Sequence, residues 1–197
     1  MTAPIKINYK IYQGSTFQEQ YRWESGTKVY KPITGITKSA PVEITAEAHE
    51  LKPGWRFRVT NVTGMKEINS GSESFYLASD ISADTIKINS VNSLAFSNYT
   101  GNSGVIEYNE PVDLTGYRAR MQIREKVGSD VVIDELTTEN GKIIIDAEDA
   151  TIRIEIPADT TQNYNFTTAV YSLEIIRNSV VIPFLVGNLT LQREVTR

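Results

Sequence analysis

The chain has few side chains of the types that perform catalysis, and their spacing does not suggest an active site. It contains one His, His49, and no Cys. A thiolate nucleophile, a thiolate metal site and a disulfide are therefore excluded, and a lone His has no second His or Cys with which to share a metal ion. We expect His49 to lie in a turn or at the surface.

The acidic group Asp146, Glu148 and Asp149 is a second candidate for chemistry, because carboxylate oxygens bind Ca²⁺. The group lacks the ligand spacing and the distal Glu of an EF-hand loop, so we interpret it as a solvated turn. The 24 Asp and Glu residues supply many carboxylate pairs for glycosidic cleavage, but no pair stands out. We therefore predict no metal, no cofactor and no enzymatic activity. A hydrolase of the cell envelope is a third functional class that nothing in the sequence recommends.

Trp55 and three arginines are the candidate interface residues. Trp55 follows the turn residues 52–54, where its ring could be exposed, and an exposed ring could anchor a protein partner or stack on a sugar. We favour packing within the protein, or a protein interface, over a sugar site for Trp55. Arg118, Arg120 and Arg124 share one face of a predicted strand. They could meet acidic neighbours in an assembly, although ordinary solvation explains them as well.

Charge and hydropathy exclude further classes. The net charge is −4, whereas binding to a phosphate backbone requires clustered Lys and Arg. No apolar run approaches the ~20 residues that span a bilayer, and the N-terminal segment lacks the apolar core of a signal peptide. We expect a protein made in a cytoplasm, with no nucleic-acid partner and no membrane insertion.

Period-two alternation dominates the sequence and predicts β-strands. Apolar residues alternate with polar ones in Ile5–Ile11 and again in Phe17–Trp23, which flank the turn residues 13–15 and predict a hairpin. Alternation is cleanest in Tyr117–Arg124. Further strands are expected at 33–38, 42–45, 56–60, 74–79, 85–89, 131–136, 142–146, 151–156, 169–177, 180–186 and 188–194, with one helical turn at 159–164.

The segment Pro111–Gly116 is best explained as a turn. Asp113 can accept hydrogen bonds from backbone N–H groups, Thr115 can do so more weakly, and Gly116 can adopt a positive φ before the next strand. We assign these residues a structural role.

The middle of the chain contains four characteristic segments, Ile33–Pro41, Thr45–Leu51, Val62–Asn69 and Phe96–Gly101. Together they resemble a small β module named for the first catalytic-cysteine half-domain of ubiquitin-activating enzymes. The pattern departs at Glu50, where viral versions have Gly. The resemblance implies a fold and no thioester chemistry, because the chain has no Cys.

A second set of segments lies on both sides of this middle part, namely Ile11–Phe17, Tyr21–Glu24, Pro111–Arg124, Ile152–Pro157, Tyr171–Ile175 and Gly187–Arg197. These outer segments resemble a family of small bacteriophage and prophage tail proteins. In family members without an insertion, the Trp-bearing strand leads within a few residues into the Pro-Val-Asp-Leu-Thr-Gly turn. We therefore expect a domain inserted into a hairpin loop between Trp23 and Pro111, with residues 29–30 and 106–108 side by side.

These observations predict an all-β fold: an antiparallel, Ig-like β-sandwich of residues 1–30 and 108–197, split by a small barrel-like domain at 31–107. The resemblance implies a collar or adaptor around a phage tail tip or baseplate, located in the virion. A homo-oligomeric ring is expected, in contact with the tail tube, the baseplate hub or fibres. The alternative is a module that binds host-surface polysaccharide, with Trp55 as its stacking residue.

Overall fold

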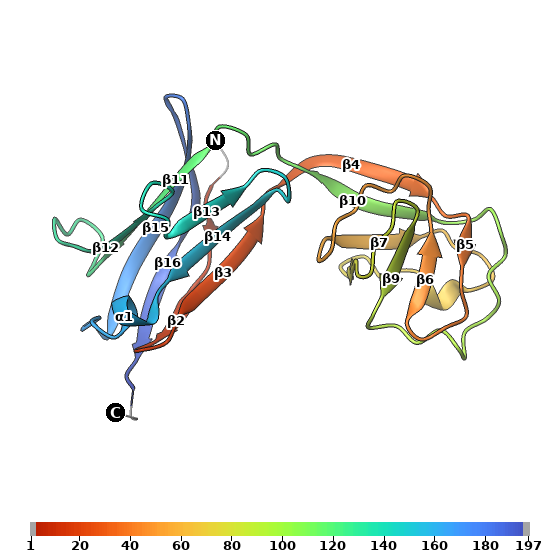
Figure 1. Cartoon of the computed structure of the whole chain (residues 1–197), viewed down its shortest axis with the longest axis horizontal. Helices are drawn as coiled ribbons and strands as arrows, with labels where there is room; N and C mark the ends of the chain where they lie inside the picture. The colour runs from red at the N-terminus through yellow and green to blue at the C-terminus, as the bar shows by residue number, and fades with distance from the viewer. Residues whose placement is uncertain (1–2, 195–197) are drawn as a thin grey trace. The chain divides into compact units, whose positions relative to one another are not determined.

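The computed structural model describes residues 3–194, and this part of the chain is almost entirely β-structure (Figure 1). The described residues form sixteen strands, a short 3₁₀ helix and one short α-helix. The all-β prediction is thus confirmed at the level of fold class. No apolar stripe of helical period occurs in the sequence, so little helix is expected on physical grounds as well.

The chain divides into two compact units. The first is built from the segment that ends at Trp23 and the segment that begins at Val112, and the second is Glu24–Pro111. Strands β4 (Glu24–Pro32) and β10 (Val105–Pro111) carry the chain into and out of the second unit and pair antiparallel. Val29 pairs with Tyr108, so the expectation that these segments lie side by side is confirmed. The domain boundaries expected near residues 30 and 108 fall inside this strand pair, all of which belongs to the second unit.

The larger sheet of the first unit is organised around one long strand. Strand β16 (Val180–Gln192) pairs with β15 (Thr168–Arg177) on one side, and β11 (Arg118–Arg124) and β12 (Val132–Thr137) follow beyond β15, all antiparallel. On its other side β16 pairs with both N-terminal strands, which run parallel to it. These are β1 (Ile5–Lys6) and β2 (Tyr9–Tyr12).

A three-stranded sheet completes the first unit, in the order β13 (Ile143–Asp146), β14 (Thr151–Ile156), β3 (Phe17–Arg22). Alternate residues of β14 are fully buried, as its period-two pattern predicts. The two sheets contribute to one core. The helix α1 (Ala158–Thr161) connects β14 to β15. Core side chains from both sheets include Ile11, Phe17, Met121, Ile123, Ile152, Ile154, Leu173 and Leu185.

Three details of the predicted topology are wrong. Strands β2 and β3 do not form a hairpin, because β2 pairs with β16 whereas β3 pairs with β14 in the other sheet. Their alternation is real, since Ile11 and Phe17 are both buried, but the two residues enter one core from opposite sheets. The sheet is mixed, not purely antiparallel. The predicted break at Gly187 is absent, since this residue stays in the ladder opposite Tyr171.

The insertion also differs from the expected one. The strand before it, β3, belongs to the three-stranded sheet, and the strand after it, β11, belongs to the larger sheet. The second unit is therefore inserted into a connection between sheets and not into a hairpin loop.

The second unit contains two sheets around its own core. One has the order β4, β10, β7 (Arg56–Thr60), β8 (Tyr76–Leu77), and the other β5 (Gly35–Ile36), β6 (Val42–Thr45), β9 (Thr85–Ile88). A bridge between Ser79 and Lys87 links the segment after β8 to β9. At the opposite margin the chain passes from β4 into β5, and the N–H of Ile33 donates to the carbonyl of Gly104 as a continuation of the β4–β10 pairing. The 3₁₀ helix η1 (Lys66–Ile68) places Ile68 in the core.

The N-terminal segment, which runs parallel to β16, approaches its backbone closely at Gly187. The N–H of Ile7 donates to the carbonyl of Val186, at 2.9 Å, and the carbonyl of Ile7 accepts a hydrogen bond from the hydroxyl of Tyr171, also at 2.9 Å. A Cβ atom at residue 187 would overlap the carbonyl group of Ile7. Gly187 is therefore required by close backbone approach.

We predict that Gly187→Ala destabilises the first unit by about 3 kcal/mol, because overpacked sites cost ~1–3 kcal/mol and backbone atoms cannot move aside cheaply. Urea unfolding measures the change. Gly26→Ala is the matched control, since an added Cβ at this strand position meets no atom within 4 Å. Equal stability of the two variants would contradict this account.

Candidate functional site

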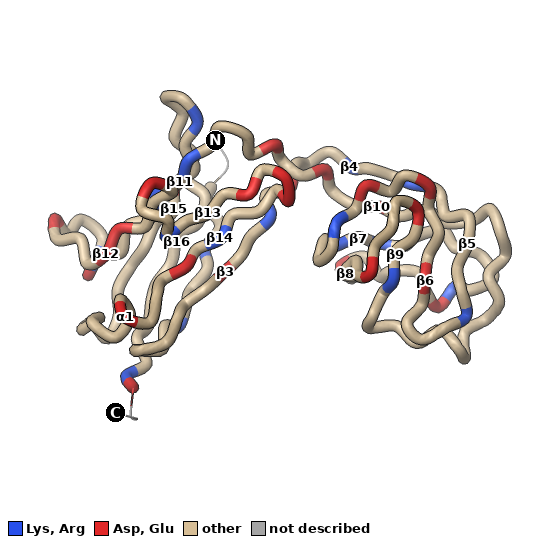
Figure 2. The backbone as a smooth tube through the Cα atoms, in the orientation of Figure 1, with Lys and Arg blue, Asp and Glu red and all other residues tan. Residues whose placement is uncertain are grey.

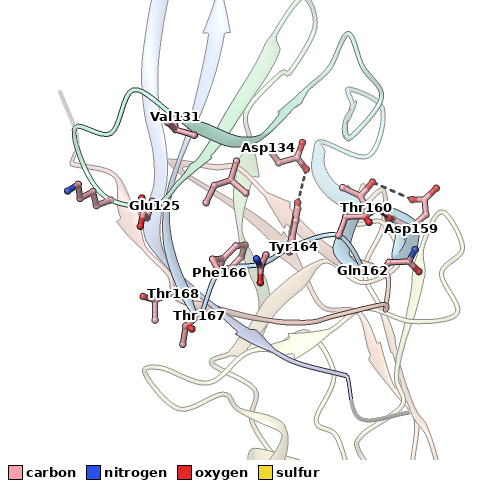
Figure 3. A pocket seen from close by; sticks show the side chains of 14 residues that line it. Glu125, Val131, Asp134, Asp159, Thr160, Gln162, Tyr164, Phe166, Thr167 and Thr168 are labelled. Carbon is pink, nitrogen blue, oxygen red and sulfur yellow. Dashed lines mark hydrogen bonds between the residues drawn. The ribbon is translucent and has the colours of Figure 1, made fainter. Parts of the chain in front are cut away.

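A groove of about 1150 Å³ opens in the first unit between the β11–β12 hairpin and the segment that runs from α1 into β15 (Figure 3). The hairpin supplies Val131, Ile133 and Asp134 to one wall. The other wall carries mostly amide and hydroxyl side chains above two aromatic rings. These residues are Asp159, Thr160, Gln162, Asn163, Tyr164, Asn165, Phe166, Thr167 and Thr168.

Asp134 is held by two partners at the groove. Lys142 Nζ lies 2.7 Å from Oδ1 and 2.9 Å from Oδ2 of Asp134. The Tyr164 hydroxyl donates to Oδ2 at 2.7 Å, as the dashed line between these two residues in Figure 3 shows. Burial, and then the hydrogen bond to Asp134, raise the pKa of Tyr164. A carboxylate already paired with an ammonium and a phenol is poorly placed to act as a general base. The trio therefore joins β12, the start of β13 and the segment after α1.

The groove is suited to binding. Its lining residues include no His, and the Thr160 hydroxyl donates at 3.3 Å to the exposed carboxylate of the neighbouring Asp159. From residue 3 to residue 194, no three His, Asp or Glu side chains come together in a way that could hold a metal ion. Amides and hydroxyls above aromatic rings can hold a ligand by hydrogen bonds and apolar contact.

Exposed aliphatic side chains mark the hairpin beside the groove. Val127 is 87% exposed and Val131 68% exposed, and Val132 is also exposed. Single exposed aliphatic residues are common, whereas a group on one projecting element indicates an interaction surface. The sequence gives no signal for these valines, because residues 131–136 resemble an ordinary strand and residues 125–130 an ordinary loop.

The edge strand β12 is closed by side chains. Asn140 accepts from the N–H of Thr137 through Oδ1 and donates to the carbonyl of Glu135 through Nδ2, both at 2.9 Å. Asp134 Oδ1 accepts from the N–H of Glu135 at 2.8 Å. Unpaired edges are templates for pairing with another chain, so these bonds disfavour strand addition at the end of β12.

We predict that Asn140→Ala opens this edge. The loss of two hydrogen bonds should lower stability by about 1–2 kcal/mol, and the freed backbone groups should promote association between strands. Sedimentation velocity and thioflavin binding report the association, with the exposed Asn89→Ala as the control. If both variants remain as monodisperse as the parent, the capping role of Asn140 is wrong.

The structure decides for Trp55 in favour of packing, one of the alternatives left open, and corrects the expected placement of His49. Trp55 is 8% exposed and packs in the core of the second unit, with its ring 6.4 Å from that of Tyr108. The exposed ring considered for a protein or sugar interface is therefore absent. His49 directly follows a turn, but it is only 1% exposed and therefore does not lie at the surface. Its Nδ1 accepts from the N–H of Leu51 at 3.0 Å, and its Nε2 lies 3.3 Å from the carbonyl of Thr85.

His49 and Tyr108 together tie the loop after β6 to β10. The Tyr108 hydroxyl donates to the carbonyl of His49 at 2.9 Å. Burial, with the charges of Glu50 and Glu110 as smaller causes, raises the pKa of Tyr108 to about 12. The group is thus neutral in the folded protein at a pH where the unfolded chain has begun to ionise.

Stability should therefore fall as pH rises from 10 toward 12, because the unfolded state releases the Tyr108 proton first. Below pH 10, Tyr108→Phe should be about 1 kcal/mol less stable than the parent, because the hydrogen bond to His49 is lost. Above pH 10 its stability should fall less steeply than that of the parent, because the variant has no phenol at this position to ionise. Urea unfolding across this range measures both effects. The exposed Tyr30→Phe serves as control, and an alkaline slope unchanged by Tyr108→Phe would contradict the assignment.

The three candidate arginines lie on the face of β11 that points away from the core. Arg118 lies 3.6 Å from Glu139, and Arg120 donates to Glu174 at 2.8 Å. Arg124 donates to Gln122 Oε1 and to the carbonyl of Ser129. Two of the three are thus engaged with acidic neighbours on adjacent parts of their own unit.

Two predicted turns have the expected local chemistry. Asp113 Oδ1 accepts from the N–H of Thr115 at 2.9 Å, the bonds from Thr115 hold the pKa of Asp113 below its usual value, and Gly116 has a φ of 75°. In the acidic group, Asp146 Oδ1 accepts from the N–H of Asp149 at 2.9 Å. Both segments are stabilised as turns.

No protein-family model matches the chain, and the curated proteins contain no sequence that matches it. None of the described helices has the length and apolar character needed to cross a lipid bilayer.

Proposed function

We propose that the chain is a structural component of a bacteriophage tail, a collar or adaptor at the tail tip or baseplate that holds fibres or neighbouring tail proteins. The observation that carries the binding role is the exposed Val127, Val131 and Val132 beside an open groove. The tail assignment is supported by the resemblance of Pro111–Arg124, whose Asp113 turn leads directly into β11.

The proposal includes the finer fold assignment. The first unit is an Ig-like β-sandwich, and the second is a small barrel-like domain inserted into it. Two sheets that share one core support the first part. For the second part, the bridge between Ser79 and Lys87 joins the two sheets at one margin, and the chain itself passes from β4 into β5 at the other.

The proposed role is non-catalytic. In the best-formed polar cluster of the groove, the carboxylate of Asp134 is already bonded to Lys142 and Tyr164. Partners are then other tail proteins, namely the tail tube, the baseplate hub or fibres, together with further copies of the chain in a ring within the virion. Rings arise from heterologous contacts, in which one surface of a copy meets a different surface of the next.

The polysaccharide-binding alternative has lost the residue that suggested it. Trp55 packs against Tyr108 and presents no open face to a sugar. The groove retains amides and hydroxyls, but its rings Tyr164 and Phe166 are buried. The exposed valines favour a protein partner, because aliphatic groups bury well against protein and offer no flat face for stacking.

We predict that the purified protein forms oligomers whose masses are multiples of 22.1 kDa and that antibodies against it label phage tails. The paired substitution V127D/V131D should weaken association about tenfold or more, since burial of one Val contributes ~1.5 kcal/mol and a tenfold change requires 1.4 kcal/mol. Sedimentation equilibrium measures the oligomers.

The matched control is L77D/L94D, which places the same two charges at exposed aliphatic positions of the second unit. A protein that stays monomeric at high concentration and never co-purifies with tails would refute the proposal. If both paired substitutions weakened self-association equally, the β11–β12 hairpin would not be the interaction surface.

A further inference from the structure

A second hollow, of about 560 Å³, lies on the outer face of the larger sheet in the first unit. Four of its strands contribute, namely β1, β11, β15 and β16, together with the start of the β11–β12 hairpin. The lining residues are Lys6, Gln122, Arg124, Lys126, Val127, Gly128, Val170, Tyr171, Ser172, Val186, Gly187 and Asn188.

The hollow is cationic in a chain that is acidic as a whole. Lys6, Arg124 and Lys126 line it, and no lining residue is Asp or Glu, although the net charge of the chain is −4. The Arg124 guanidinium is fixed by neutral partners, because it donates to the carbonyl of Ser129 and to Gln122 Oε1, the latter at 2.8 Å from Nη2. These bonds orient the cation without neutralising it, so the hollow favours negative charge.

The lining indicates a protein segment as the occupant. Val170 and Val186 form an aliphatic floor, and Val127 stands exposed at the rim. The one aromatic residue of the lining, Tyr171, is buried, so the hollow offers no ring for a sugar to stack on. Three cations also fall short of the extended basic track along which a nucleic-acid backbone binds. A segment with both carboxylates and an aliphatic side chain fits best.

The chain carries such a segment on its other sheet. The turn between β13 and β14 holds Asp146, Glu148 and Asp149, all exposed, and Figure 2 shows acidic residues at this turn. Ile144, on the strand that leads into it, is 39% exposed. The hollow faces away from the core on the larger sheet, whereas the turn joins two strands of the sheet across the core. The two surfaces therefore suit contact between copies.

We propose that the acidic β13–β14 turn of one copy docks into the cationic hollow of a second copy. This contact rests on the proposed function, and it supplies the heterologous interface that a ring of identical subunits requires. Carboxylates of the turn meet Lys6, Arg124 and Lys126, and the aliphatic floor receives the side chain of Ile144.

A charge-swap experiment tests the contact. K6E/K126E and, separately, Glu148→Lys should each weaken self-association about tenfold or more, and the triple variant should recover most of it, because the charges are exchanged. Arg124 is left unchanged since it holds the hairpin. K10E/K38E alters two exposed lysines outside the hollow and should associate like the parent apart from its added charge.

Circular dichroism shows that each variant is folded, and Glu148→Gln, which removes charge without reversing it, should have an intermediate effect. Recovery by the triple variant supports the contact. If K6E/K126E forms oligomers as well as the parent, or if the triple variant associates no better than the variants it combines, the docking contact is refuted but the proposed ring is not. Loss of binding to another acidic tail protein with unchanged self-association also overturns it. If the parent protein never self-associates, the ring in the proposed function is refuted as well.

Discussion

The structure of the first unit depends on the hydrogen bonding of β16 along both of its sides. One side pairs antiparallel with β15 over ten residues, and the other receives β1 and β2 in parallel. Parallel pairing brings the beginning and the end of the sequence into one ladder. Because β2 and β3 then enter opposite sheets, Ile11 and Phe17 reach the same core from opposite sheets. The close approach of Ile7 to Gly187 lies between the β1 and β2 pairings with β16.

The sequence predicted individual strands better than their partners. Alternation located β6, β7 and β14 at the residues where the structure has them, because one face of each strand is buried. Pairing depends on which backbone groups meet in space, and alternation carries no information about this. The hairpin expected from the turn at residues 13–15 failed for that reason, since the turn crosses between sheets.

Burial of single residues followed the same division. Turn chemistry was predictable at Asp113 and Gly116, where the side chain acts on its own neighbours. The burial of Trp55 was left open because its position after a turn says nothing of the strand packed above it, and Tyr108 lies far away in the sequence. The cationic hollow was likewise hidden, since Lys6 and Arg124 are brought together only by a sheet that joins distant strands.

The junction between the two units has a consequence for how such a protein changes over generations. The N–H of Val112 donates to the carbonyl of Trp23 at 2.8 Å, so the residues on either side of the second unit are already hydrogen-bonded to each other. Each unit has its own core. Removal or replacement of residues 24–111 by recombination leaves both flanking ends where a short connection can join them. Recombination can thus add, replace or delete the second unit while the core of the first unit is kept.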